Sequence, residues 1–200
     1  MPILKTKLYR PQVPADYVPR PRLLDLLERS CDTPLTLVSA PAGYGKSTLV
    51  SAWLETSAVP TAWLSLDEGD SSLSSFLRYF VAAVRSLAPE ACPGTLALIS
   101  GPSLPPTSVI ADELLAELDC IEDPFVLVLD DLGFIKEPKV HELLTRILKQ
   151  DITTSLTILS PSAYHIPVRN APFPGTFTAK EFSPWQIRLQ PAKHHWEPSR

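Results

Sequence analysis

The chain has 200 residues, of which 44% are hydrophobic and 20% are charged, and its formal net charge is −4. This length and composition are typical of one well-buried α/β domain and exclude a disordered chain. A mildly acidic chain argues against a nucleic-acid-binding surface, which would need clustered lysine and arginine. We therefore expect no direct DNA binding by this chain alone.

The cysteines and the apolar runs indicate in which cellular compartment the protein is expected. Cys31, Cys92 and Cys120 are widely spaced and form no pattern typical of a metal or redox site, so we interpret them as small apolar side chains in a reducing cytosol. The first twelve residues lack the long apolar core of a signal peptide, and the longest apolar runs are too short to cross a bilayer. The sequence therefore predicts a cytoplasmic protein.

The predicted elements alternate between strands and helices along the chain. A proline-punctuated arm over residues 3–21 precedes a short helix over residues 20–30. We expect strands over residues 34–40, 61–66, 125–130 and 153–160, and helices over residues 46–58, 71–87, 109–118 and 138–149. Residues 88–106, rich in proline and glycine, are expected to form a connection. Strands that alternate with helices favour a parallel sheet covered on both faces.

Residues 40–48 read Ala-Pro-Ala-Gly-Tyr-Gly-Lys-Ser-Thr and match the phosphate-binding pattern GxxxxGK[ST], except that alanine stands at the first glycine. A triphosphate needs a concave row of backbone N–H donors, and glycine allows the loop to curl around it. Lys46 is predicted to reach the β- and γ-phosphates, and Ser47 to place its hydroxyl on Mg²⁺. The residues expected to contact the nucleotide here are Ala42, Gly43, Tyr44, Gly45, Lys46, Ser47 and Thr48. The alternative is a chance turn before a helix, but the preceding apolar strand and the following helix favour the phosphate loop.

Two aspartates end the most apolar predicted strand. Ligands of parallel α/β sheets bind beyond the carboxyl ends of the strands. We therefore expect Asp130, on a strand next to that of the phosphate loop, to hold Mg²⁺ together with Ser47. Asp131 either orients or deprotonates the attacking water or is a solvated turn residue. Lys46, Asp130 and Asp131 are thus the candidate catalytic residues.

The remaining acidic residues and histidines of interest are mostly interpreted as structural. Asp67 and Glu68 follow the second predicted strand, where they either approach the water or metal or cap a helix, and for Asp67 we favour the cap. His141 lies among apolar residues and is interpreted as structural. His194 and His195 lie in the irregular tail and are not interpreted as a metal site.

The motifs occur in an order that resembles a known family. The segments LKTKLYRPQ, VPRPRLLDLLE, LTLVSAPAGYGKSTLVSAWL, TAWLSLDEGD, FLRYFVAAVRSLAP and FVLVLDD are similar to the N-terminal ATPase domain of MalT-like, LuxR-type transcriptional regulators, which belong to the STAND class of P-loop NTPases. The similarity covers about the first 160 residues, and an alanine-first phosphate loop is usual in that family. It implies a three-layer αβα P-loop NTPase fold with a parallel sheet.

The resemblance also implies a function. It implies an ATP/ADP switch in which ADP holds a closed monomer and ATP permits self-association, and it carries over Lys46, Ser47, Thr48 and Asp130 to this chain. Because the VPRPRLL segment of such domains lies near the adenine, Val18, Arg20 and Arg22 become candidate adenine-side residues. The residue pattern and the resemblance together divide the chain into an N-terminal arm and short helix over residues 1–33 and a P-loop ATPase core over residues 34–160. The residue pattern alone predicts an irregular proline-rich tail over residues 161–200, with one short strand at 185–189.

Three departures from the family pattern affect these expectations. Gly133 stands where the family pattern DDxH has histidine, and Ser160-Pro161-Ser162 replaces a segment that carries a γ-phosphate-sensing arginine. The family's winged-helix, repeat and DNA-binding modules are absent from the sequence, as in a truncated or frame-shifted product. We therefore expect slow or absent ATP turnover. A non-catalytic remnant that binds protein partners is the main alternative, and a small-molecule kinase ranks last because no arginine-rich lid is recognisable.

Overall fold

A parallel β-sheet forms the middle of the molecule in the computed structural model, which describes residues 3–29, 35–149, 154–160 and 186–190. The strands are β1 (Leu35–Ser39), β2 (Thr61–Ser65), β3 (Phe125–Asp130), β4 (Thr154–Ser160) and β5 (Gln186–Gln190), in the order β2-β3-β4-β1-β5. The first four pair in parallel, and β5 adds an antiparallel edge to β1. The predicted α/β class is confirmed, and β5 is the one antiparallel exception among the described strands.

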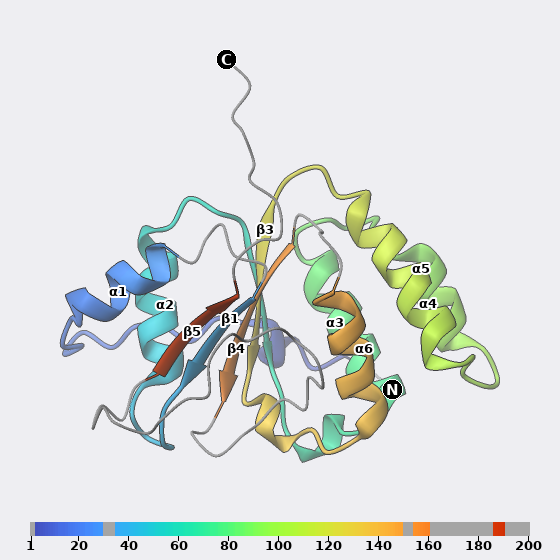
Figure 1. The fold of residues 1–200 in the computed structure, drawn as a ribbon, viewed down its shortest axis with the longest axis horizontal. Helices are drawn as coiled ribbons and strands as arrows, with labels where there is room; N and C mark the ends of the chain where they lie inside the picture. Colours follow the sequence, from blue (N-terminus) through green and yellow to red (C-terminus); the bar gives the residue numbers. More distant parts are fainter. Residues whose placement is uncertain (1–2, 30–34, 150–153, 161–185, 191–200) are drawn as a thin grey trace.

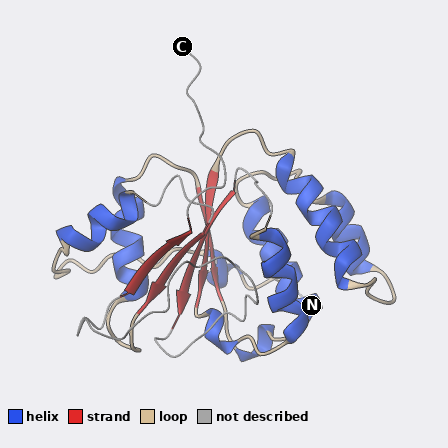
Figure 2. Ribbon diagram, in the orientation of Figure 1, coloured by secondary structure: helices blue, strands red, loops and turns tan. Residues whose placement is uncertain are grey.

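Helices cover both faces of this sheet (Figures 1 and 2). One face carries α1 (Pro21–Glu28) and α2 (Lys46–Thr56), and the other carries α3 (Leu73–Arg85), α4 (Pro93–Ser100), α5 (Thr107–Asp119) and α6 (Pro138–Ile147). Short 3₁₀ turns occur at η1 (Lys5–Leu8), η2 (Glu68–Asp70) and η3 (Leu132–Phe134). The expected arrangement of three layers is therefore observed.

The side chains of β3 alternate between the two faces of the sheet, so this one strand packs against both helix layers. Phe125, Leu127 and Leu129 belong to the hydrophobic cluster shared with α3–α6, whereas Val126 and Val128 belong to the cluster shared with α1 and α2. Successive side chains of a strand point to opposite faces, and a strand buried on both faces needs apolar residues at every position. The same alternation assigns Asp130 to the face of α2, which begins at Lys46.

Two local predictions were wrong. Residues 88–106 are not only a connection, because they contain α4, which begins at Pro93 after Cys92 in a left-handed conformation with φ of 57°. The N-terminal arm is not wholly extended, because Lys5–Leu8 form η1. The expected short strand near residue 185 is observed as β5, while residues 161–185 and 191–200, which contain the rest of the predicted tail with His194 and His195, lie outside the described residues.

Candidate nucleotide site

The loop between β1 and α2 is shaped by two glycines. Gly43 and Gly45 have φ of 80° and 76°, in the left-handed region that is costly for residues with a Cβ. Gly45 is also the N-cap of α2, so the loop runs directly into the helix and the first amides of α2 face outward from it. Ala42, Gly43 and Tyr44 are exposed, which leaves the outer rim of the loop open to a ligand.

Lys46 is held inside this loop. Its side chain is largely buried, with the residue 7% exposed, and its Nζ donates hydrogen bonds to the carbonyl oxygens of Ala40 at 3.0 Å and Pro41 at 3.3 Å. The ammonium therefore lies at the inner edge of the bend, beside the first turn of α2. A cation and a helix N-terminus at one point make this a favourable site for phosphate groups.

Asp130 is a buried carboxyl with an incomplete set of partners. The residue is 5% exposed, and its Oδ1 has no hydrogen-bond partner within the part of the chain that the structure describes. Burial raises the pKa of Asp130 to about 6, and the charge of Asp131 adds to the rise, while Ser47 and Lys46 oppose it. Because both opposing groups start α2, Asp130 and the phosphate loop lie on the same side of the sheet.

The strand that carries Asp130 is not the neighbour of the loop's strand, contrary to the expectation. Strand β4 separates β3 from β1, and its residue Ile158 pairs with Leu37 of β1 on one side and with Leu129 of β3 on the other. Asp130 approaches Ser47 because α2 begins over this face of the sheet, not through strand pairing. Strand order depends on long-range pairing, which local sequence does not report.

Asp131 is exposed and has φ of 59°, an unusual conformation for a residue other than glycine that aspartate tolerates better than most. This turn at the end of β3 separates the two acidic side chains. Asp130 stays buried beside α2, and Asp131 enters the pocket in front of the loop. Residues held in sparsely populated backbone conformations are frequent at functional sites.

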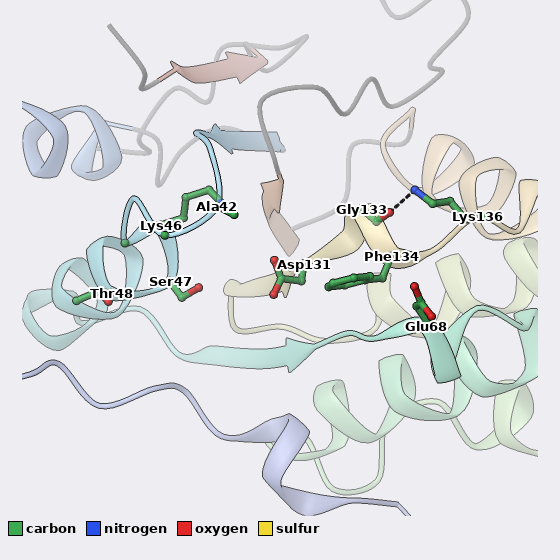
Figure 3. Close-up of a pocket in the computed structure, with 11 residues that line it drawn as sticks. Ala42, Lys46, Ser47, Thr48, Glu68, Asp131, Gly133, Phe134 and Lys136 are labelled. Atoms are coloured by element: carbon green, nitrogen blue, oxygen red, sulfur yellow. Dashed lines mark hydrogen bonds between the residues drawn. The ribbon is translucent and has the colours of Figure 1, made fainter.

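A pocket of about 640 Å³ lies between the phosphate loop and the turns that follow β2 and β3. One wall is the loop with the start of α2, and the opposite wall is formed by η2 and the segment around η3, with Asp131 between them (Figure 3). The lining residues are Ala42, Gly43, Gly45, Lys46, Ser47, Thr48, Glu68, Asp131, Gly133, Phe134 and Lys136. The volume is in the range of small-molecule sites.

Comparisons with known proteins identify relatives of the chain. No family model matches the chain. It is similar to the HTH-type transcriptional regulator MalT of Klebsiella pneumoniae, with 31% identity over 169 residues, and to that of Yersinia pestis, with 32% identity over the same length. Each alignment covers 84% of this chain and 19% of the relative.

Over most of its length the chain is similar to a MalT-like regulator N-terminal region. It spans about a fifth of the length of the MalT relatives that it matches. In the described part of this MalT-like chain, no helix is long and apolar enough to cross a membrane. The same residues hold no group of three or more histidine, cysteine, aspartate or glutamate side chains placed to bind a metal ion.

Most of the residues predicted to bind the nucleotide or the metal line the pocket of the MalT-like region, but four of them do not. Tyr44 is exposed, and its carbonyl oxygen accepts a hydrogen bond of 2.9 Å from Nη1 of Arg20, which therefore contacts the outside of the loop. Arg22 is exposed on α1. Asp130 is buried behind the residues that line the pocket and is not one of them.

Three lining residues were not predicted as site residues: Gly133, Phe134 and Lys136. In the sequence Gly133 is only a departure from the family pattern DDxH, and nothing marks Phe134, which is 44% exposed, or Lys136 as pocket residues. Glu68 lines the pocket as well, whereas Asp67 caps η2 by accepting from the amide of Gly69. Of these two adjacent acids, Asp67 is therefore the cap and Glu68 is the pocket residue.

The contacts of His141 agree with its interpretation as a structural residue. His141 is half-buried on α6, and its Nε2 lies 3.0 Å from the carbonyl oxygen of Ile135, which precedes that helix. Burial lowers the pKa of His141, although the bond to Ile135 opposes the change. This contact ties the helix to the segment before it, as a structural residue would.

Proposed function

We propose that this region is an ATP/ADP-binding switch domain of a signal-responsive transcriptional regulator with weak ATP hydrolysis. The observation that carries the proposal is the buried Lys46 ammonium in a glycine-bent loop, on the same side of the sheet as the under-coordinated Asp130 carboxyl. The names of the relatives support the regulatory role. Self-association in the ATP state is part of the proposal.

Different residues would bind the phosphates and the metal ion. Lys46 would move from the carbonyls of Ala40 and Pro41 to the β- and γ-phosphates, and the first amides of α2 would donate to the same groups. Ser47 and Asp130 would hold Mg²⁺, directly or through its waters, because a carboxylate oxygen without a partner beside a hydroxyl is the donor set that this ion prefers. Bound Mg²⁺ would supply charge neutralisation for the phosphates.

Asp131 is the candidate for orienting water, because it is exposed to the pocket and lies in front of the loop. Thr48, on the first turn of α2, would donate to a phosphate. Val18, Arg20 and Arg22 are proposed as adenine-side residues, with Arg20 holding the outside of the loop through the Tyr44 carbonyl. The segment Ser160-Pro161-Ser162, at the end of β4, carries no arginine, and this supports slow turnover.

Equilibrium binding of Mg·ATP and Mg·ADP to the purified chain tests the proposal. Lys46→Ala removes charge-assisted hydrogen bonds to phosphate, so we expect both affinities to fall by roughly 10- to 100-fold. Lys139→Ala, which removes an exposed lysine of α6, is the matched control and should leave both affinities unchanged. Equal affinities of wild type and Lys46→Ala would contradict the phosphate-binding role of Lys46, and no binding by the wild type would favour the inert remnant.

A further inference from the structure

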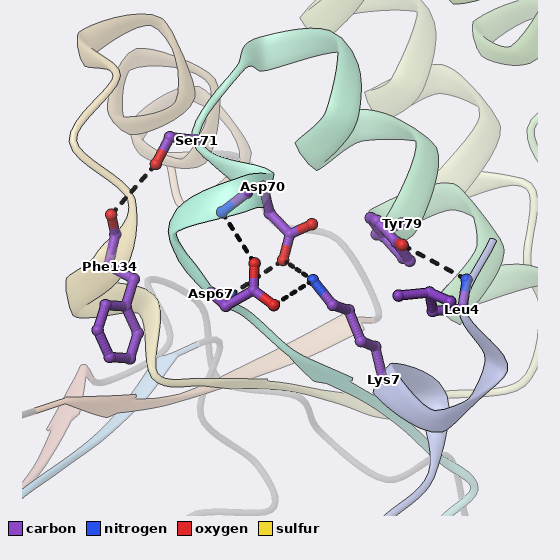
Figure 4. A network of polar contacts seen from close by, with 8 residues as sticks. Leu4, Lys7, Asp67, Asp70, Ser71, Tyr79 and Phe134 are labelled. Atoms are coloured by element: carbon purple, nitrogen blue, oxygen red, sulfur yellow. Dashed lines mark hydrogen bonds and ion pairs between the residues drawn. The ribbon is translucent and has the colours of Figure 1, made fainter. Parts of the chain in front are cut away.

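The N-terminal arm is fastened to the turn after β2 by a buried ion pair. Nζ of Lys7, in η1, lies 2.6 Å from Oδ2 of Asp70 and 2.7 Å from Oδ2 of Asp67, both at η2 (Figure 4). The side chain of Asp70 is 2% exposed and that of Lys7 is 14% exposed. A pair this well buried is costly to break from one side, because the remaining charge loses its partner.

The same carboxylates determine the shape of η2. Oδ2 of Asp70 also accepts from the amide of Asp67 at 3.0 Å, and Oδ1 of Asp67 accepts from the amide of Gly69 at 2.9 Å. Burial by itself would lower the pKa of Lys7, but Asp67 and Asp70 raise it overall, and the Lys7 ammonium lowers the pKa of Asp67. Lys7 and Asp67 are therefore charged at neutral pH, and the ammonium is an integral part of the capping arrangement.

Further contacts hold the arm in place. The amide of Leu4 donates to the hydroxyl of Tyr79 on α3 at 3.4 Å, and Nζ of Lys7 lies 5.0 Å from the centroid of the Tyr79 ring. Ile3 and Leu8 pack against the hydrophobic cluster on the α3 side of the sheet. The arm therefore approaches η2 with several anchors, and Lys7 is the one that reaches the turn itself.

The turn that Lys7 holds is part of the pocket wall that faces the phosphate loop. Glu68, between the two aspartates bonded to Lys7, lines the pocket. Immediately after η2, Oγ of Ser71 donates to the carbonyl oxygen of Phe134 at 3.3 Å and so joins η2 to η3 (Figure 4). Because Gly133 and Phe134 also line the pocket, one set of contacts runs from the arm through η2 to both parts of this wall.

We propose that Lys7 is a positioning residue that fixes the pocket wall opposite the phosphate loop and thereby sets the preference for a nucleoside triphosphate over a diphosphate. This inference rests on the proposed nucleotide site. The loop and the start of α2 would bind the phosphates from one side, and the terminal phosphate would face Glu68, Asp131 and Phe134 on the other side of the pocket. A displaced wall would therefore affect the ligand that has a terminal phosphate more than the one that lacks it.

The test compares the affinities for Mg·ATP and Mg·ADP in wild type, Lys7→Met and Lys7→Arg. For Lys7→Met we expect the ratio of the ADP to the ATP dissociation constant to change by at least about fivefold, a usual size for coupling between sites, and Lys7→Arg should restore most of it. Lys5→Met, which removes an exposed lysine of the same turn, is the matched control and should leave the ratio unchanged. Equal changes in both affinities would overturn the proposal, as would no change.

Two additions separate this proposal from folding defects and from the nucleotide proposal. The double variant Lys7→Met/Asp70→Asn removes both charges and keeps an oxygen for the Asp67 amide, so it replaces Lys7→Met if that variant does not fold. Hydrogen exchange without nucleotide should increase at residues 67–71 and also at 132–136 when Lys7 is replaced. Unchanged exchange at 132–136 would refute positioning by Lys7, whereas failure of the wild type to bind either nucleotide would refute the nucleotide site and the preference only.

Discussion

Asp130 is an acidic residue at a buried position where an apolar residue would make the fold more stable. The residue continues the buried face of β3 formed by Val126 and Val128, and burial raises its pKa to about 6. A carboxyl group that is 5% exposed and has an unpartnered oxygen destabilises the fold when it is ionised. Such a cost is typical of groups kept for a ligand.

Replacing Asp130 by asparagine should therefore stabilise the nucleotide-free chain at neutral pH. Between the ordinary aspartate pKa near 4 and the folded value of about 6, the folded state holds more protons than the unfolded state, so stability falls as pH rises and the full penalty is present above about pH 6. We expect Asp130→Asn to gain roughly 2 to 3 kcal/mol at pH 7.5 and little near pH 4. Urea denaturation at the two pH values measures this, and a gain independent of pH would contradict the assignment.

At the scale of elements, α4 shows how a distant side chain can start a helix. The carboxylate of Glu117, on α5, accepts from the amide of Gly94 at 2.6 Å and from the amide and hydroxyl of Thr95 at 3.1 and 2.5 Å. These amides are among the donors that a helix N-terminus leaves without partners. A cap supplied from 22 residues away explains a helix that local patterns did not predict.

Removal of this cap should destabilise the chain through α4. Glu117→Ala leaves two amides and one hydroxyl without their acceptor, and we expect a loss of about 2 kcal/mol in the free energy of unfolding. Asp119→Ala, at the end of α5 and exposed, is the control and should change stability by less than about 0.5 kcal/mol. Thermal and urea denaturation would measure both, and equal losses would show that Glu117 acts only through general helix effects.

The whole molecule is stabilised by two hydrophobic clusters on opposite faces of the sheet. The larger one lies under α3–α6, and the smaller one joins α1 and α2 to the strands through Leu27, Trp53 and Trp63. Nε1 of Trp53 also donates to Glu28 at 2.9 Å, which ties α2 to the end of α1. Helix α1 therefore belongs to the same packed layer as the helix of the phosphate loop.

Leu27 is the residue on which the packing of α1 depends most. It is fully buried, so Leu27→Ala should cost roughly 2 to 4 kcal/mol, because a cavity remains in the smaller cluster. Leu23→Ala, on the same helix but only half-buried, should cost clearly less. Denaturant titration compares the two variants, and equal losses would argue that α1 is held by its backbone contacts instead of by packing.

Local patterns in the chain were enough to predict the elements that depend on near neighbours. The glycine loop before Lys46, the unbroken apolar run that ends at Asp130 and the helical stripe of α3 each depend on neighbours a few residues apart, and their expected positions match the structure. Two features became visible only in the folded chain: β4 separates β1, which precedes the loop of Lys46, from β3, which carries Asp130, and Lys7 meets Asp70 across 63 positions of sequence. Such contacts depend on how whole layers pack, because strand order and ion pairing over long separations leave no periodic trace in the chain.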